Sequence, residues 1–248
     1  MRRRVYGTLV AVCFMLSGYY VLQYQHEQVW LATKAKEIVQ AAHVSLPEER
    51  VLALRDYLRD HIRGEGLAIE GRPFLRATAK EVLETGQGFC GEATRAFIAL
   101  ARHLGISAHR INLYGTMAHV VAEAAIMPGK WVLVDGQDNP TANGFLDQKW
   151  WTLDEAIVSA GSPFTDYSYF NMRRAPVVNL VVQRVKLYSG WVSWMLENPP
   201  LIKAGLSAVL AGLLAGLWFL DRLLWTNSTP HESPCKPRVS ESTNASNA

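Results

Sequence analysis

The chain has 248 residues, of which 49% are apolar and 19% are charged, and its formal net charge is +3. Soluble domains average roughly 25% charged residues, so this chain is poor in charge and does not have the composition of a disordered protein. The net charge is too small to indicate a nucleic-acid-binding protein, and three cysteines are too few to stabilise a disulfide-rich scaffold of this length.

The first apolar segment follows the basic residues 1–4 and carries no formal charge from Val5 to Gln25. A helix rises about 1.5 Å per residue, so a segment of this length can cross a bilayer core of roughly 30 Å. No small-x-small cleavage site follows it, which favours an uncleaved signal anchor over residues 5–24 rather than a removed signal peptide. The positive-inside rule then places residues 1–4 in the cytoplasm.

The next part of the chain has the periodicity and capping patterns of helices. Residues 25–43 continue as a helix from the anchor, and the pattern Ser45-Leu46-Pro47-Glu48 resembles a capping box that opens a helix through about Ile62. A second box, Thr78-Ala79-Lys80-Glu81, opens a short helix that is expected to end at Gly86.

Cys90 follows a glycine-rich turn and begins the next predicted helix, which ends at Gly105. The unpaired N–H groups and the dipole at a helix N-terminus favour a thiolate over a thiol, and the backbone N–H of Cys90 could help to hold an oxyanion. The alternative interpretation is an inert cysteine that packs as a small apolar residue. Cys90 is the single cysteine of the central region, so a disulfide partner within that region is excluded.

The periodicity then changes to that of short strands, at residues 106–114, 119–126 and 130–135, with a turn at Pro128-Gly129 between the last two. Thr152 opens one more short helix. Helices followed by an antiparallel meander predict an α+β fold.

His119 begins the second of these strands and Asp135 ends the third. Their positions are nearly symmetric about the turn, so the two side chains are expected to lie close together at the open end of one hairpin. A carboxylate there can fix the tautomer of an imidazole whose other nitrogen faces a thiol. A purely structural histidine is the alternative interpretation.

The C-terminal part of the chain contains a second apolar segment. Residues 176–200 contain Tyr188, Trp191 and Trp194 and predict a juxtamembrane amphipathic segment, although a strand followed by a loop fits them as well. Residues 201–220 are interrupted only by Lys203 and predict a membrane span rather than a buried core helix. Residues 221–248 are expected to be a disordered tail.

Gly212 and Gly216 form a GxxxG pattern in the second segment, which suggests as a hypothesis that the two spans pair through it. Two spans with a cytoplasmic N-terminus would place the folded domain, residues 25–175, on the periplasmic or extracytoplasmic side of an inner or plasma membrane.

The segments Gly88-Phe89-Cys90-Gly91-Glu92-Ala93, Leu104-Gly105-Ile106-Ser107-Ala108-His109-Arg110, Ala118-His119-Val120 and Trp131-Val132-Leu133-Val134-Asp135 resemble, in this order, the core of the transglutaminase-like superfamily. The resemblance covers about residues 78–140. It implies a papain-like fold in which helices pack on a small antiparallel sheet. It also implies a reaction through a thioester, with Cys90 as nucleophile, His119 as base and acid, and Asp135 as the residue that orients His119. Gln87 is a weaker candidate for an oxyanion donor, and a polar turn residue is its alternative role.

No zinc-ligand spacing, P-loop or GxGxxG pattern occurs, so neither a metal nor a cofactor is expected. The sequence therefore predicts a membrane-anchored cysteine enzyme that acts on amide bonds of a protein or peptide, as a peptidase, an amidase or a transglutaminase-like acyltransferase. The alternative is a non-catalytic assembly component of a membrane or envelope complex, for example in polysaccharide export. Lipid contact through the two spans is expected in both cases, and a nucleic-acid partner in neither.

Overall fold

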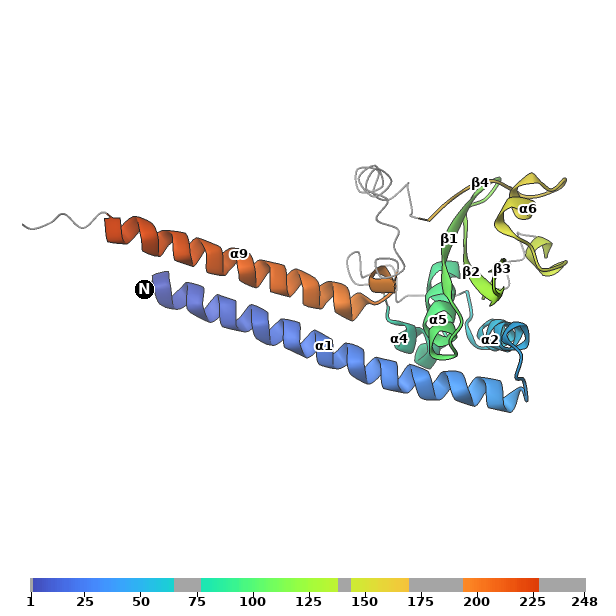
Figure 1. The fold of residues 1–248 in the computed structure, drawn as a ribbon, viewed down its shortest axis with the longest axis horizontal. Helices are drawn as coiled ribbons and strands as arrows, with labels where there is room; N and C mark the ends of the chain where they lie inside the picture. The colour runs from blue at the N-terminus through green and yellow to red at the C-terminus, as the bar shows by residue number, and fades with distance from the viewer. Residues whose placement is uncertain (1, 65–76, 138–143, 170–193, 228–248) are drawn as a thin grey trace, which may run out of the picture.

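The computed structural model describes residues 2–64, 77–137, 144–169 and 194–227. Two long helices run side by side as a rod, and the remaining helices and strands form a domain at one end of it (Figure 1). The rod consists of helix α1, Arg2–Ala41, and helix α9, Pro199–Asn227. The expected anchor and the expected helix that follows it are thus one continuous helix of 40 residues.

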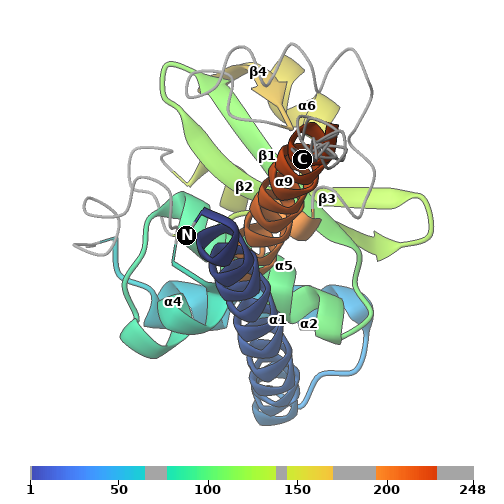
Figure 2. The same cartoon turned by 90° about the vertical axis from the view of Figure 1, so that its left-hand side faces the viewer.

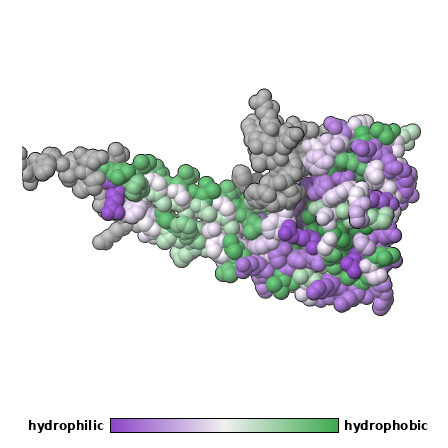
Figure 3. Space-filling model, in the orientation of Figure 1, coloured by the Kyte–Doolittle hydropathy of each residue, from purple (hydrophilic) through white to green (hydrophobic). Residues whose placement is uncertain are grey.

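Both rod helices are long and apolar enough to cross a membrane, over Val5–Ala41 and Pro199–Leu223, and little of their apolar surface is buried within the protein. Figure 3 shows this surface as a mainly apolar stem next to a largely polar domain. Helix α9 continues to Asn227, so the expectation of a disordered tail from residue 221 is wrong for its first seven residues. The reason is that Leu223, Leu224 and Trp225 extend the apolar helical sequence. Residues 228–248 lie outside the described residues.

The two rod helices pack along their length in opposite chain directions, as Figures 1 and 2 show together. Small side chains lie at their contact, since Cys13, Ala204 and Ala211 are buried. The Ser17 hydroxyl donates a hydrogen bond to the Ala204 carbonyl oxygen at 3.1 Å. The hypothesis that the GxxxG pattern pairs the spans is wrong, because a Cβ added at any glycine of this pattern would meet no atom within 4 Å.

The domain is an α+β fold, with helices packed on a four-stranded antiparallel sheet whose strand order is β3-β2-β1-β4. The strands are β1 (Ala108–Gly115), β2 (His119–Met127), β3 (Lys130–Val134) and β4 (Phe164–Ser168). Helices α2 (Pro47–His61), α4 (Ala79–Thr85) and α5 (Cys90–His103) lie with the second half of α1 on one face of this sheet (Figure 2).

Helix α5 lies between the other helices and the sheet, and its apolar face is fully buried. The core on this side combines α1, α2, α4 and α5 with alternate residues of β2 and β3, and includes Leu31, Leu54, Leu58, Phe97, Leu100, Ala122, Ala124, Val132 and Val134. The opposite face of the sheet has a smaller core, covered by helix η2 (Phe145–Asp147) and helix α6 (Leu153–Val158), to which Phe164 of β4 contributes. The sheet therefore separates two cores, and the helix that begins at Cys90 crosses the larger one.

The capping patterns explain where the helices begin. Thr78 and Glu81 form the expected reciprocal box at α4, and Thr152 forms the same box with Glu155 at α6. At α2 the expected box is displaced by one residue. The carboxylate of Glu49 accepts from the backbone N–H groups of Ser45 and Leu46, because Pro47 takes the first helical position and leaves Leu46 as the N-cap.

The three predicted strands are confirmed within two residues at each end, whereas β4 and η2 were not predicted. Most of the expected juxtamembrane segment, residues 176–193, lies outside the described residues. Its last residues are described, and residues 194–196 form a helical turn directly before α9.

Candidate active site

Cys90 occupies the first position of α5, where a helix of 14 residues directs its N-terminus at the thiol. The turn before it is short because Gly86 ends α4 in the left-handed conformation, with φ +64°. The thiol is free and partly buried. Helix N-termini carry partial positive charge and unpaired N–H groups, so this position favours a thiolate and provides a backbone donor for an oxyanion.

His119 and Asp135 are both buried, with 1% and 5% of their surface exposed. The His119 Nε2 atom lies 2.8 Å from Asp135 Oδ2. The register of the hairpin pairs Ala122 with Val134, so its continuation places Val121, rather than His119, opposite Asp135. The structure thus brings the two residues together as diagonal neighbours on one face, a relation within reach of long side chains.

The Cys90 thiol is hydrogen-bonded to the His119 ring, which completes a continuous arrangement of thiol, imidazole and carboxylate. Since Nε2 contacts Asp135, Nδ1 is the nitrogen that remains for the thiol. The ring of Phe164 lies nearly parallel to the imidazole, with centroids 6.5 Å apart, and limits its movement on that side.

The electrostatics of this arrangement favour charge separation between sulfur and ring. Burial opposes a charged imidazole, but hydrogen bonds to Asp135 and Cys90 outweigh it and raise the pKa of His119 to about 10. Burial also opposes a thiolate, yet the hydrogen bond and charge of His119, together with a hydrogen bond from the backbone of Val120, lower the pKa of Cys90. Both shifts favour the ion pair of thiolate and imidazolium over the neutral pair.

A hydrogen bond from a side chain to the backbone links α5 to the strand that carries the histidine. The Thr94 hydroxyl, one turn after Cys90, donates to the Val120 carbonyl oxygen at 3.0 Å. Val120 follows His119 directly, so this bond couples the position of the helix to that of the imidazole. The distance between thiol and ring is consequently set by the fold rather than by a loop.

Two residues that the sequence did not single out fix Asp135. The Gln137 backbone N–H donates to Asp135 Oδ1 at 3.1 Å, while its side-chain amide donates to the Gly88 carbonyl oxygen at 3.1 Å. Arg59 of α2 donates through Nε to the Asp135 carbonyl oxygen at 2.9 Å. Gln137 could have been suspected from its place two residues after Asp135, but no local pattern marks Arg59.

Gln87 lies in the turn before Cys90, and its side chain is exposed. Its backbone pairs with Arg63 in a single bridge, and its N–H lies 3.4 Å from the Thr85 hydroxyl. A role for the Gln87 side chain as an oxyanion donor stays a prediction.

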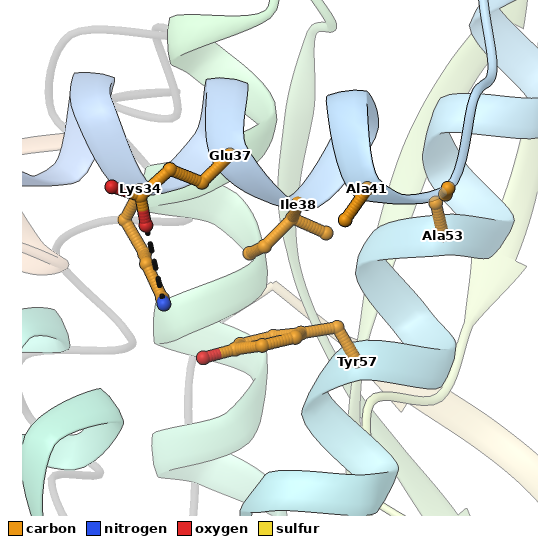
Figure 4. A pocket seen from close by; sticks show the side chains of 7 residues that line it. Lys34, Glu37, Ile38, Ala41, Ala53 and Tyr57 are labelled. Carbon is orange, nitrogen blue, oxygen red and sulfur yellow. Dashed lines mark hydrogen bonds and ion pairs between the residues drawn. The ribbon is translucent and has the colours of Figure 1, made fainter.

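Other titratable groups lie apart from this site. His109 and Glu123 form a cross-strand pair with 2.9 Å between Nε2 and Oε2. A pocket of about 300 Å³ lies between α1 and α2, where the ion pair of Lys34 and Glu37 faces Tyr57 (Figure 4). Across the described ranges, no group of three His, Cys, Asp or Glu side chains could hold a metal ion.

Comparisons with known proteins show a match to one family over the region that contains these residues. Residues 32–136 match the Transglutaminase-like superfamily. Among solved structures, the chain is similar to a "Putative Cysteine Protease from Cytophaga hutchinsonii", with 21% identity and a TM-score of 0.38 over 44% of this chain and 37% of that one. It is also similar to a "putative protease from Parabacteroides distasonis", with 14% identity and a TM-score of 0.36 over 50% of this chain and 26% of that one.

No curated protein matches the chain. The matched solved structures are longer, since the chain spans well under half of the length of each. The family match nevertheless includes Cys90, His119 and Asp135 and most of the helices and strands that position them. Residues 32–136 are therefore similar to the transglutaminase-like superfamily over somewhat under half of the chain.

Proposed function

We propose that the protein is a membrane-anchored, cysteine-dependent acyl-transfer enzyme that acts on amide bonds of proteins or peptides. The observation that carries this proposal is the buried imidazole of His119, which is hydrogen-bonded to Cys90 on one side and to Asp135 on the other. An inert packing cysteine would need neither an imidazole partner nor a position at a helix N-terminus.

The arrangement supports a two-stage reaction. The Cys90 thiolate attacks the carbonyl carbon of the amide, and the backbone N–H of Cys90 can stabilise the oxyanion that forms. The His119 imidazolium donates its proton to the leaving nitrogen, the C–N bond breaks, and a thioester with Cys90 remains. Asp135 keeps the ring oriented through both stages.

In the second stage His119 acts as a base. It removes a proton from water or from an amine, which attacks the thioester carbonyl, and the C–S bond breaks to regenerate the thiolate with the imidazolium. Water gives a peptidase or amidase, and an amine gives a transglutaminase.

Membrane anchoring is part of the proposal. It is supported by two apolar helices whose surfaces are mostly exposed, and by the three arginines before the first of them. These features favour an inner or plasma membrane, with the domain on the periplasmic or extracytoplasmic side.

The test is acylation of the full chain in detergent by a peptidyl ester, with acid quenching and intact-mass detection of the thioester. Cys13 and Cys235 are replaced with serine, so that Cys90 is the sole thiol. We expect one acyl group per chain, released by hydroxylamine, and no acyl group after Cys90→Ala. Equal acylation of the Cys90→Ala protein would disprove the proposal.

A second experiment separates the enzyme from the alternative role as an assembly component. A membrane-impermeant thiol reagent applied to intact cells should label Cys90, which tests topology and thiol reactivity together. If the Cys90→Ala chain fully restores the wild-type phenotype in a deletion strain, the assembly role is favoured. If it does not, the result supports catalysis.

A further inference from the structure

The residues just before α9 are inserted into the domain next to the site. Glu197 is 6% exposed, although it is a carboxylate two residues before an apolar helix. It forms a two-pronged ion pair with Arg110 of β1, through Nε to Oε1 and through Nη2 to Oε2 at 2.6 Å. Arg95 of α5 lies on the same carboxylate, with 3.4 Å between Nε and Oε2.

Arg110 extends from this carboxylate to the first turn of α5. Its Nη2 atom donates to the Gly91 carbonyl oxygen at 2.8 Å. The guanidinium also fills the space beside Gly91, because a Cβ added there would lie 3.2 Å from Nη1. Gly91 follows Cys90 directly, so the guanidinium contacts the peptide next to the proposed nucleophile.

Neighbouring contacts fix the position of Glu197. Trp194 packs on Tyr24 of α1 with ring centroids 5.3 Å apart, and the Arg102 guanidinium of α5 lies 4.2 Å from the same tryptophan ring. Asn198 accepts from the Gln28 amide of α1 at 3.4 Å. The segment 194–198 is thus held between α1 and α5 on both sides of the glutamate.

We propose that Glu197 is a positioning residue for Cys90: through Arg110 it fixes the first turn of α5, and it thereby ties the membrane-proximal end of α9 to the thiol. The inference rests on the proposed function, in which Cys90 is the nucleophile. A bidentate carboxylate suits this task, because it fixes both the place and the plane of a guanidinium.

Because the thiol is surrounded by charges, the direction in which its pKa changes can distinguish a positioning role of Glu197 from a purely electrostatic one. Cys90 interacts with His119 of β2, Asp135 after β3 and Arg110 of β1, and Arg110 also interacts with Glu92 of α5. If Glu197 acted only through its negative charge, its neutralisation would favour the thiolate and lower the apparent pKa of the thiol. If it acts by positioning, its loss loosens the contact between thiol and imidazole and raises that pKa.

The experiment measures the rate of alkylation of Cys90 by iodoacetamide against pH, in the full chain with Cys13 and Cys235 replaced with serine. For Glu197→Gln we expect the pH midpoint of Cys90 alkylation to rise by about one unit. At pH values below the midpoint, alkylation would then be about tenfold slower. The matched control is Glu27→Gln, since Glu27 is equally buried, at 6%, but lies on α1. An unchanged or lowered midpoint for Glu197→Gln would overturn the inference.

Arg110→Lys provides a second variant in case Glu197→Gln does not fold. Lysine keeps the charge but cannot bridge the Gly91 carbonyl and both carboxylate oxygens, so we expect the same rise, and an unchanged midpoint overturns the inference. A merely structural role would lower the melting temperature without moving the midpoint. Failure of the proposed function is distinguishable, because the parent protein would then show an ordinary thiol midpoint that His119→Ala leaves unchanged.

Discussion

His119 and Asp135 are diagonal neighbours across the β2–β3 hairpin, and their side chains meet through one contact, 2.8 Å from Nε2 to Oδ2. The diagonal relation leaves Oδ1 of the carboxylate available, and the Gln137 backbone N–H occupies it. Asp135 is therefore held on one side by its own loop while it holds the imidazole on the other. Its orientation does not depend on the substrate.

Asp135→Asn tests the contribution of the carboxylate. The amide has no charge to stabilise the imidazolium and can favour the wrong tautomer, so we expect acylation of Cys90 to slow about 10³-fold with little change in folding. The measurement is the single-turnover rate of thioester formation. Asp147→Asn is the matched control, because Asp147 also contacts Arg59 but not His119. A loss of less than tenfold for Asp135→Asn would contradict the role.

The raised pKa of His119 predicts a pH dependence of stability. The pKa of this histidine is raised from about 6.5 to about 10 on folding. Burial opposes this rise, and the hydrogen bonds and charges of Asp135 and Cys90 outweigh it. The charged ring therefore stabilises the fold fully below about pH 6.5, and this contribution is lost as the pH rises through about 10. We expect the difference in melting temperature between the parent chain and His119→Gln to narrow between pH 7 and pH 10.5.

His103 provides a control of opposite sign for that experiment. Burial and the charge of Arg102 lower the pKa of His103, so the folded state disfavours its protonation. The difference between the parent chain and His103→Gln should change at acidic pH, as the pH falls through the ordinary histidine range, and stay constant between pH 8 and pH 10.5. Parallel curves for the two variants would contradict the assignment of the shifts.

Gly86→Ala should destabilise the domain at the turn before Cys90. The residue has φ +64°, and an added Cβ would lie 2.8 Å from the His61 carbonyl oxygen. We expect the free energy of unfolding to fall by about 2–3 kcal/mol, from left-handed strain and the clash together. Gly129→Ala is the control, since its φ is +77° and no atom lies within 4 Å. Gly129→Ala should lower the free energy of unfolding only by the left-handed strain, about 1 kcal/mol. Chemical unfolding measures the free energy of unfolding of both variants. Equal losses would contradict a contribution from the clash at Gly86.

The contact between α1 and α9 predicts which face of α9 tolerates a larger side chain. Ala211 is fully buried, whereas a Cβ at Gly212 would meet no atom within 4 Å. Ala211→Leu should separate the helices and lower the melting temperature in detergent by several degrees, and Gly212→Leu should leave it within about one degree. The reverse order would show that the glycine face is the packed one.

Local patterns predicted most of the fold, because α2, α4 and α6 begin at capping patterns and two of the strands flank a Pro-Gly turn. Thr78 and Glu81 are near in sequence and form the expected box. The thiol, imidazole and carboxylate come together because α5 packs on β2 of the hairpin, with only β1 between them in the chain. The hairpin argument found a contacting pair even though the register is displaced by two residues, since such a displacement keeps both side chains on one face.

What the sequence did not predict depends on contacts between distant segments. Strand β4 pairs with β1 across some fifty residues, and its sequence Phe-Thr-Asp-Tyr-Ser has no clear apolar alternation. Glu197 meets Arg110 across 87 positions, in a segment expected to lie on the membrane surface. No local rule links such partners, because neither residue is unusual in its own neighbourhood.

Helix α1 runs without interruption from the apolar stem into the core of the domain (Figure 1). Beyond Gln25 it continues for 16 residues, or about 24 Å. There is no hinge along this length, so a bilayer that held the stem would also set the height and tilt of Cys90. For the proposed enzyme, this would restrict cleavage to bonds that reach the distance from the membrane at which α1 holds the thiol. The unbroken length of α1 would thus set the distance from the membrane at which the thiol meets a substrate.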